Sequence, residues 1–195
     1  MSKKKIAVLF ADGFEEIEAL SVVDFLRRAD IQAEMVSIKD SVDVVGSHGI
    51  KLKCDGILSN LKTEIVTDYN GVVLPGGLPG AEHLRDSDAV MALIKQMAEA
   101  GKIVAAICAA PIALERAGLT NGKKGTAYPG YNTELSYREF KEDIVVQDGN
   151  LITARGPATS IYFALKIIEV LSGKETSDQI AEDLLVPLVE SQICN

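Results

Sequence analysis

The 195-residue chain has little of what marks several large classes of protein. It has no tryptophan, only 5% aromatic residues, and a surplus of acidic side chains that gives a net charge of −8. Without a basic surplus to neutralise phosphates, nucleic acid is not an expected partner. The longest apolar run, residues 103–114, is short and contains a proline, so no membrane span is predicted either.

Cysteine and histidine are also scarce. The three cysteines, at positions 54, 108 and 194, form no disulfide framework and no C-x-x-C pair, which favours a reducing, cytoplasmic location. The two histidines, His48 and His83, do not stand at ligand spacing from a cysteine, so no metal and no other cofactor is predicted. The length and the 47% hydrophobic content suit one globular domain over residues 1–195.

Strand and helix patterns alternate along the chain. Buried strands are indicated by short apolar runs at residues 6–10, 32–38, 69–74 and 103–108. Helices are indicated by amphipathic segments at residues 15–29, 89–100 and 161–171. Turn signals predict hairpins at residues 42–54 and 144–154, and Thr176 with Gln179 has the pattern of a capping box for a last helix. This alternation predicts an α/β domain whose mainly parallel sheet is covered on both faces.

The most informative stretch runs from residue 103 to residue 116. Its apolar, β-branched start predicts a buried strand that stops at Cys108, and Pro111 then opens a helix. A nucleophile at such a bend has the geometry of a nucleophile elbow, where helix N–H groups face the sulfur. We therefore expect the thiol pKa to lie clearly below that of a free thiol. The alternative is that Cys108 is one more small buried hydrophobic residue.

Two more loops are expected at the same edge of the sheet, because the carboxyl ends of parallel strands meet there. Gly76 and Gly77 follow a strand and either present backbone N–H groups to an oxyanion or form a plain tight turn. The loop at residues 11–18 carries Glu18 among apolar residues. A carboxyl placed against a thiol would keep one proton shared between the two groups.

Four motifs, at residues 14–18, 73–77, 105–111 and 154–160, together resemble the ThiJ/PfpI superfamily. The resemblance is strongest to the branch of the Parkinson-disease protein deglycase and its bacterial homologues. It implies a flavodoxin-like three-layer sandwich, similar to class I glutamine amidotransferases, and usually a homodimer. It implies Cys108 as a nucleophile in a strained backbone conformation and Glu18 as its protonated partner.

Members of this family are described as glutathione-independent glyoxalases, deglycases, oxidation sensors and chaperones. For the enzyme, the Cys108 thiolate would attack an α-oxoaldehyde such as methylglyoxal, or its adduct on a glycated side chain. Backbone N–H groups near Gly76, Gly77 and Ala109 would stabilise the oxyanion, and Glu18 would shuttle a proton until water releases the hydroxy acid. The alternative is a non-enzymatic sensor oxidised at Cys108, or a redox-regulated chaperone.

The chain also departs from the pattern of the family. Tyr128 stands where members often have a histidine, and tyrosine is a far weaker base near neutral pH. Ala109 replaces the histidine of the protease-like branch, and no histidine follows Cys108, so neither a peptidase nor an amidotransferase is predicted. His48 occupies the place of a basic residue that reaches the partner's site, or is a plain loop residue. Arg155 would hold a substrate anion or form a structural pair.

Overall fold

A mainly parallel sheet forms the centre of the computed structural model, which describes residues 3–61 and 65–193. Within these ranges seven strands pair in the order β10-β11-β7-β6-β1-β2-β5, and each neighbouring pair is parallel except β10 with β11. The strands of this sheet are β1 (Lys5–Phe10), β2 (Gln32–Ser37), β5 (Gly56–Ile57), β6 (Gly71–Leu74), β7 (Ile103–Ile107), β10 (Val145–Asp148) and β11 (Leu151–Ala154).

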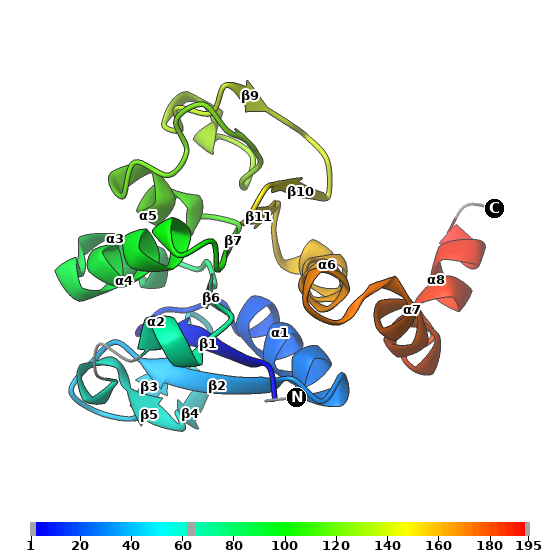
Figure 1. The fold of residues 1–195 in the computed structure, drawn as a ribbon, viewed down its shortest axis with the longest axis horizontal. Coiled ribbons are helices and arrows are strands. Elements are labelled where there is room, and N and C mark those ends of the chain that lie inside the picture. The colour runs from blue at the N-terminus through cyan, green and yellow to red at the C-terminus, as the bar shows by residue number, and fades with distance from the viewer. Residues whose placement is uncertain (1–2, 62–64, 194–195) are drawn as a thin grey trace.

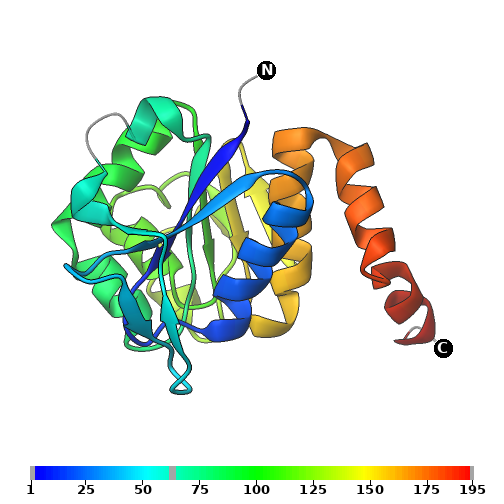
Figure 2. The ribbon, with the colours of Figure 1, turned by 90° about the horizontal axis from the view of Figure 1, so that it is seen from below.

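Helices cover both faces of this sheet, as Figures 1 and 2 show. The helices are α1 (Glu16–Arg28), α2 (Ile65–Asp68), α3 (Gly80–Asp86), α4 (Asp88–Glu99), α5 (Pro111–Arg116), α6 (Ser160–Ser172), α7 (Lys174–Asp183) and α8 (Val186–Ile193). Leu26 of α1 and Phe163 of α6 lie in the core on one face, and Ile94 of α4 lies in the core on the other. The predicted α/β architecture is confirmed. None of the described helices is both long enough and apolar enough to cross a membrane.

The central strands are apolar along almost their whole length because both of their faces are covered. Every residue of β6 and β7 is buried, and so is β1 after its first residue. Helix α4 shows how the local sequence sets the element bounds. The Ser87 side chain accepts a hydrogen bond from the Val90 N–H at its start, and Gly101, at φ +69°, follows its end.

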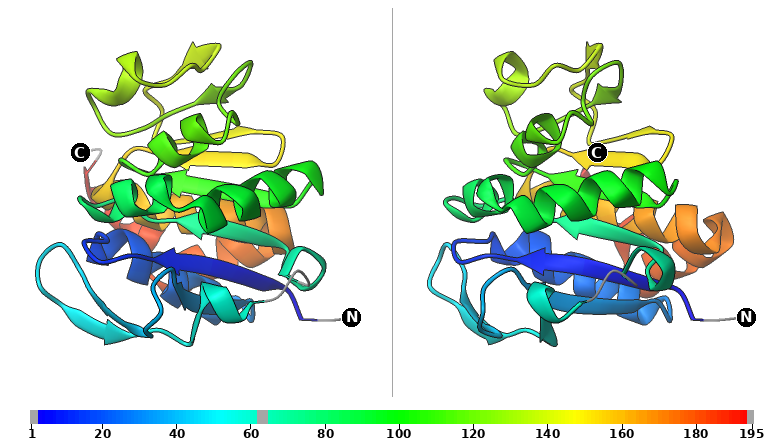
Figure 3. Two further views of the ribbon diagram at one scale, coloured as in Figure 1. Left: turned by 90° about the vertical axis from the view of Figure 1, so that its left-hand side faces the viewer. Right: turned by 60° about the vertical axis from the view of Figure 1, so that its left-hand side comes forward.

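Smaller elements extend from the sheet. The antiparallel pair β3 (Asp43–Val45) and β4 (Lys51–Lys53) confirms the first predicted hairpin, and β10 with β11 confirms the second. Residues 119–143, which we call the flap segment, contain β8 (Lys124–Gly125) and β9 (Glu139–Phe140), and Figure 3 shows the segment at one end of the molecule. Glu115 holds it by accepting hydrogen bonds from the Ser136 N–H and hydroxyl, both at 2.7 Å.

The C-terminal region differs from the prediction. Helix α7 starts at Lys174 with Gly173 as its N-cap, so the capping box expected at Thr176 is wrong. Gly173, at φ +92°, ends α6 and lets the next helix begin immediately, which places Thr176 inside α7 with its hydroxyl donating to the Ser172 carbonyl. A further helix, α8, follows, and both lie outside α6 in Figure 2. Cys194 lies outside the described residues.

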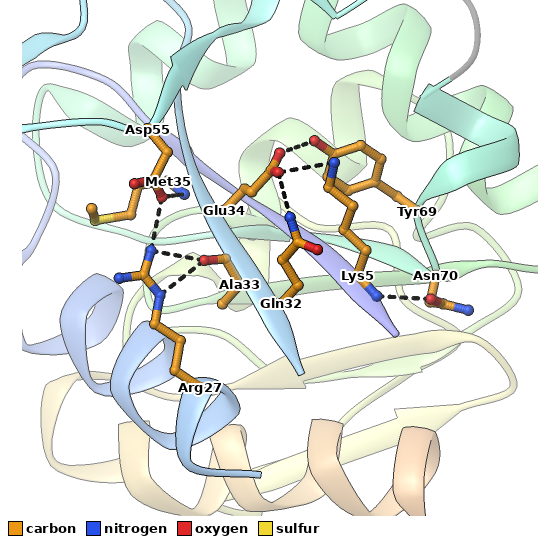
Figure 4. A network of polar contacts seen from close by, with 9 residues as sticks. All are labelled: Lys5, Arg27, Gln32, Ala33, Glu34, Met35, Asp55, Tyr69 and Asn70. Carbon is orange, nitrogen blue, oxygen red and sulfur yellow. Dashed lines mark hydrogen bonds and ion pairs between the residues drawn. The ribbon is translucent and has the colours of Figure 1, made fainter. Parts of the chain in front are cut away.

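A polar network closes the amino end of the sheet (Figure 4). The Lys5 ammonium lies 2.9 Å from a Glu34 carboxylate oxygen and over the Tyr69 ring, and the Tyr69 hydroxyl donates to the same carboxylate. Beside it, the Arg27 guanidinium lies 2.8 Å from an oxygen of Asp55. Each charged group in this network therefore faces an opposite charge.

Candidate functional site

The loops after β1, β6 and β7 meet at the carboxyl edge of the sheet, because these three strands are parallel neighbours. The Glu15 N–H donates to the Gly76 carbonyl at 2.9 Å, which fastens the first loop to the second. Gly76 in turn lies against Cys108 of the third loop, since a Cβ on Gly76 would be 2.7 Å from the Cys108 Cβ. The expected gathering of the three loops at one edge is confirmed.

Cys108 occupies a sharp bend. Its φ of +63° is left-handed, a conformation that costs a residue with a side chain about 1 kcal/mol or more. Three contacts hold it there. Its N–H donates to the Ala154 carbonyl at 3.0 Å, its carbonyl accepts from the Tyr128 N–H at 2.9 Å, and Pro111 opens α5 three residues later. The strand, bend and helix predicted from residues 103–116 are present.

Glu18 is fully buried beside this bend. One of its carboxyl oxygens accepts the Gly76 N–H at 2.8 Å, and the carboxyl also hydrogen-bonds the Cys108 thiol. A Cβ on Gly76 would lie 2.7 Å from that same Glu18 oxygen, so only glycine lets the acid and the thiol approach across this position. The Gly76 N–H is thus occupied and does not serve as the oxyanion donor expected there.

The electrostatics of this pair correct one prediction. Burial raises the pKa of Glu18 to about 7, although hydrogen bonds from Cys108 and from the Gly76 N–H oppose the rise. Burial, followed by the charge of Glu18, also raises the pKa of the Cys108 thiol. The expected depression of the thiol pKa is wrong here, because desolvation outweighs the N–H groups that face the sulfur. Both shifts run in the same direction, so each group of the pair holds its proton more tightly than it would in water.

Two backbone donors do face the sulfur. The N–H groups of Ala109 and Gly77 both act on Cys108 in the direction that stabilises a negative charge. Gly77 has φ +87°, and a Cβ there would lie 2.4 Å from the Glu15 nitrogen and 2.5 Å from the Gly13 carbonyl oxygen. The turn therefore requires glycine for its conformation and for its packing against the first loop. These two N–H groups are placed to receive an oxyanion formed next to Cys108.

His48 lies at the tip of the β3–β4 hairpin and faces Glu16 of its own chain. Its backbone N–H and ring Nδ1 both lie 2.8 Å from Glu16 carboxylate oxygens. Burial alone would raise the pKa of Glu16, but the His48 side-chain and backbone hydrogen bonds lower it to about 2. Within the described ranges, Glu15, Glu16 and His48 are the group whose ligand atoms lie close enough, within 4.8 Å, to hold a metal ion.

Tyr128 and Arg155 lie around the bend. The Tyr128 backbone is bonded to Cys108, but its side chain is 46% exposed and its ring lies near Gly156. Arg155 directly follows Ala154, the residue whose carbonyl binds the Cys108 N–H. Its Nη1 is buried without a hydrogen-bond partner among the described residues. The structure therefore brings both residues to the rim of the site.

Sequence reasoning missed Tyr131. This residue opens the 3-10 turn Tyr131–Thr133 in the flap segment and packs, partly buried, against the core cluster that contains Cys108. Burial, then Glu134 and Cys108, raise the pKa of its phenol. The only signal in the sequence is a tyrosine three residues after Tyr128, across a Pro-Gly turn, and that spacing alone does not predict the approach to Cys108.

The fold and the cysteine bend define a known class of protein. The model of the DJ-1/PfpI family matches residues 4–170, and the chain belongs to this family. Its relatives include protein dj-1beta of Drosophila melanogaster, which is 39% identical over 95% of this chain and 98% of the relative. The Parkinson disease protein 7 homolog of Danio rerio is 35% identical over 95% and 99% of the two chains.

The extent of the match differs among relatives. Protein DJ-1 homolog B of Arabidopsis thaliana is 40% identical over 93% of this chain, but the chain spans only 41% of that relative. Among solved structures, oxidized DJ-1 of Toxoplasma gondii has a TM-score of 0.87 at 39% identity and covers 93% of this chain and 98% of its own. The fold expected from the superfamily is thus confirmed.

Proposed function

We propose that this chain is a cysteine-dependent, cofactor-free enzyme that converts small α-oxoaldehydes such as methylglyoxal into 2-hydroxy acids. In the deglycase version of this proposal, the same chemistry acts on the adduct that the oxoaldehyde has formed with a protein side chain. The observation that carries the proposal is the buried Cys108–Glu18 pair separated only by Gly76, with the N–H groups of Gly77 and Ala109 facing the sulfur. Nucleophile, acid–base group and oxyanion donors thus lie at one point.

In the first step, sulfur bonds to the aldehyde carbon, the carbonyl electron pair moves to oxygen, and the thiol proton passes to Glu18. The N–H groups of Gly77 and Ala109 stabilise the developing oxyanion. Return of the proton to that oxygen gives a hemithioacetal. A Glu18 pKa of about 7 suits this role, because a base works best when its pKa lies near the operating pH.

In the second step, Glu18 moves the proton on the aldehyde carbon to the neighbouring carbon through an enediolate, and the hydroxyl proton shifts between the two oxygens. The product is a thioester of the 2-hydroxy acid. Water then hydrolyses the thioester and restores the thiol. In sum, the oxoaldehyde and one water give the hydroxy acid, so the sequence needs no external oxidant or reductant.

A second proposal is a peroxide sensor built on the same sulfur. A solved relative at 39% identity is the oxidized form of DJ-1 of Toxoplasma gondii, and Cys108 of this chain, at 9% exposure, is reachable by a small oxidant. Peroxide would convert the thiol to a sulfenic acid with release of water. In this function Cys108 would be modified once, without turnover.

The experiment incubates the protein with methylglyoxal, without glutathione, and follows lactate. Cys108→Ser should lower turnover at least about 1000-fold. Cys54→Ser is the matched control, because Cys54 directly follows β4, outside the three loops of the site, and burial, followed by Asp55, raises the pKa of its thiol to about 12. Lactate formation that survives Cys108→Ser would refute the enzyme. Absence of turnover with stoichiometric oxidation of Cys108 at low peroxide would favour the sensor.

We further propose a homodimer in a reducing, cytoplasmic compartment. Ile17 and Leu20 of α1 are exposed beside the site, and so is Ile50, which lies in the turn between β3 and β4. These side chains form an apolar surface that a second copy of the chain could cover. Sedimentation velocity tests this expectation, and a monomer at micromolar concentration would contradict it.

A further inference from the structure

Tyr131 has no part in the mechanism above, but two successive backbone hydrogen bonds connect it to the nucleophile. The Cys108 carbonyl accepts the Tyr128 N–H at 2.9 Å, and the Tyr128 carbonyl accepts the Tyr131 N–H at 3.3 Å. Between them Gly130, at φ +101°, is left-handed and reverses the chain. The turn therefore returns Tyr131 toward the elbow.

The two tyrosines of this turn have different surroundings. Tyr128 is exposed, whereas Tyr131 packs, partly buried, on the core cluster that includes Cys108 and Ala109. The Tyr131 phenol also lies within the electrostatic reach of Cys108 and of Glu82 in α3. Its hydroxyl makes no hydrogen bond within residues 3–61 and 65–193, so its proton is free for a ligand. Burial and the neighbouring carboxylates keep the phenol protonated, since both raise its pKa.

We propose that the Tyr131 hydroxyl donates a hydrogen bond to the second oxygen of the substrate, the carbonyl oxygen next to the carbon that bonds to Cys108. This inference rests on the proposed function. The N–H groups of Gly77 and Ala109 face the sulfur and serve the first oxygen, which leaves the second oxygen without a donor. Negative charge develops there in the enediolate, so a donor stabilises the transition state. Tyr131 would thus select α-oxoaldehydes over aldehydes that lack this oxygen.

The test measures how well two aldehydes protect Cys108 from iodoacetamide, read by mass spectrometry of the peptide that contains it. Methylglyoxal has the second oxygen and propanal lacks it. Tyr131→Phe should raise the methylglyoxal concentration for half protection about tenfold, as the loss of one hydrogen bond predicts. The concentration for propanal should not change. For lactate formation, kcat should fall about 10- to 100-fold.

Tyr137→Phe is the matched control. It removes a phenol hydroxyl from the same flap segment, but that hydroxyl is buried against Thr153 and does not face Cys108. It should leave both protection constants unchanged. An equal loss of protection for both aldehydes in Tyr131→Phe would show a structural role and overturn the inference, as would no change for methylglyoxal. If the wild-type protein forms no lactate but the tenfold difference holds, the proposed function fails and the role of Tyr131 stands.

Discussion

The two ends of the sheet both enclose charge, and they balance it differently. At the amino end, Lys5 and Glu34 compensate each other and Tyr69 completes the network (Figure 4). At the carboxyl end, fully buried Glu18 faces the Cys108 thiol and has no cationic partner among the described residues. A carboxyl that is buried without an opposite charge has a raised pKa, and such groups are typical of functional sites. A charge that is paired with an opposite charge mainly contributes to stability. This imbalance is the reason that we place the proposed activity at the carboxyl end.

The largest expected effect comes from Glu18→Gln. Loss of the base should lower lactate formation about 100- to 10,000-fold, measured as kcat/KM.

The substitution Glu18→Gln should also stabilise the fold at pH 8. The folded pKa of about 7 lies above the reference value of 4.5, so the wild-type stability from this group is complete below pH 4.5 and is lost as pH rises through 7. Removing the buried charge should regain about 3 kcal/mol, measured by urea unfolding. Unchanged activity would contradict the comparison.

The pH profile of kcat/KM should follow the same group. Glu18 must be ionised to accept the thiol proton, so activity should fall as pH drops through about 7. The falling limb should be absent from the residual activity of Glu18→Gln. A limb centred near pH 4.5 would show that the carboxyl is not desolvated in solution.

Glu34→Gln should act at the other end in the opposite sense. It breaks a partly buried pair with Lys5 and leaves Tyr69 without its charged acceptor. We expect a loss of about 1–2 kcal/mol in the free energy of unfolding at pH 7, since the side chains are about one quarter exposed. The kcat/KM of the variant should stay within twofold of wild type. A large loss of activity would mean that the two ends are coupled.

The smallest effect is expected at a surface pair that belongs to neither end. Asp24 and Arg28 on α1 lie 2.7 Å apart, and both side chains are about half exposed. Asp24→Asn should shift the thermal midpoint by less than about 1 °C, because solvent screens such pairs. A larger shift would indicate that this face of α1 is covered in solution.

The sequence by itself determined the architecture and the position of the bend at Cys108. Alternating apolar runs and amphipathic segments define the parallel sheet and its covering helices, because burial on both faces demands continuous apolar strands. The stop at Cys108 followed by Pro111 is a local pattern, and so the bend could be predicted. The region around Thr176 could not, because two overlapping local signals compete there and the left-handed Gly173 prevails.

Only the tertiary structure decided the electrostatics of the site. The local pattern of helix N–H groups predicts a depressed thiol pKa for Cys108, but the packing of α1 against the Gly76 loop buries thiol and carboxyl together, and desolvation then dominates. The approach of Tyr131 depends likewise on a backbone bond between residues 108 and 128. Such long-range proximity leaves no periodic trace in a sequence, because it arises from how separate loops meet once the strands have paired.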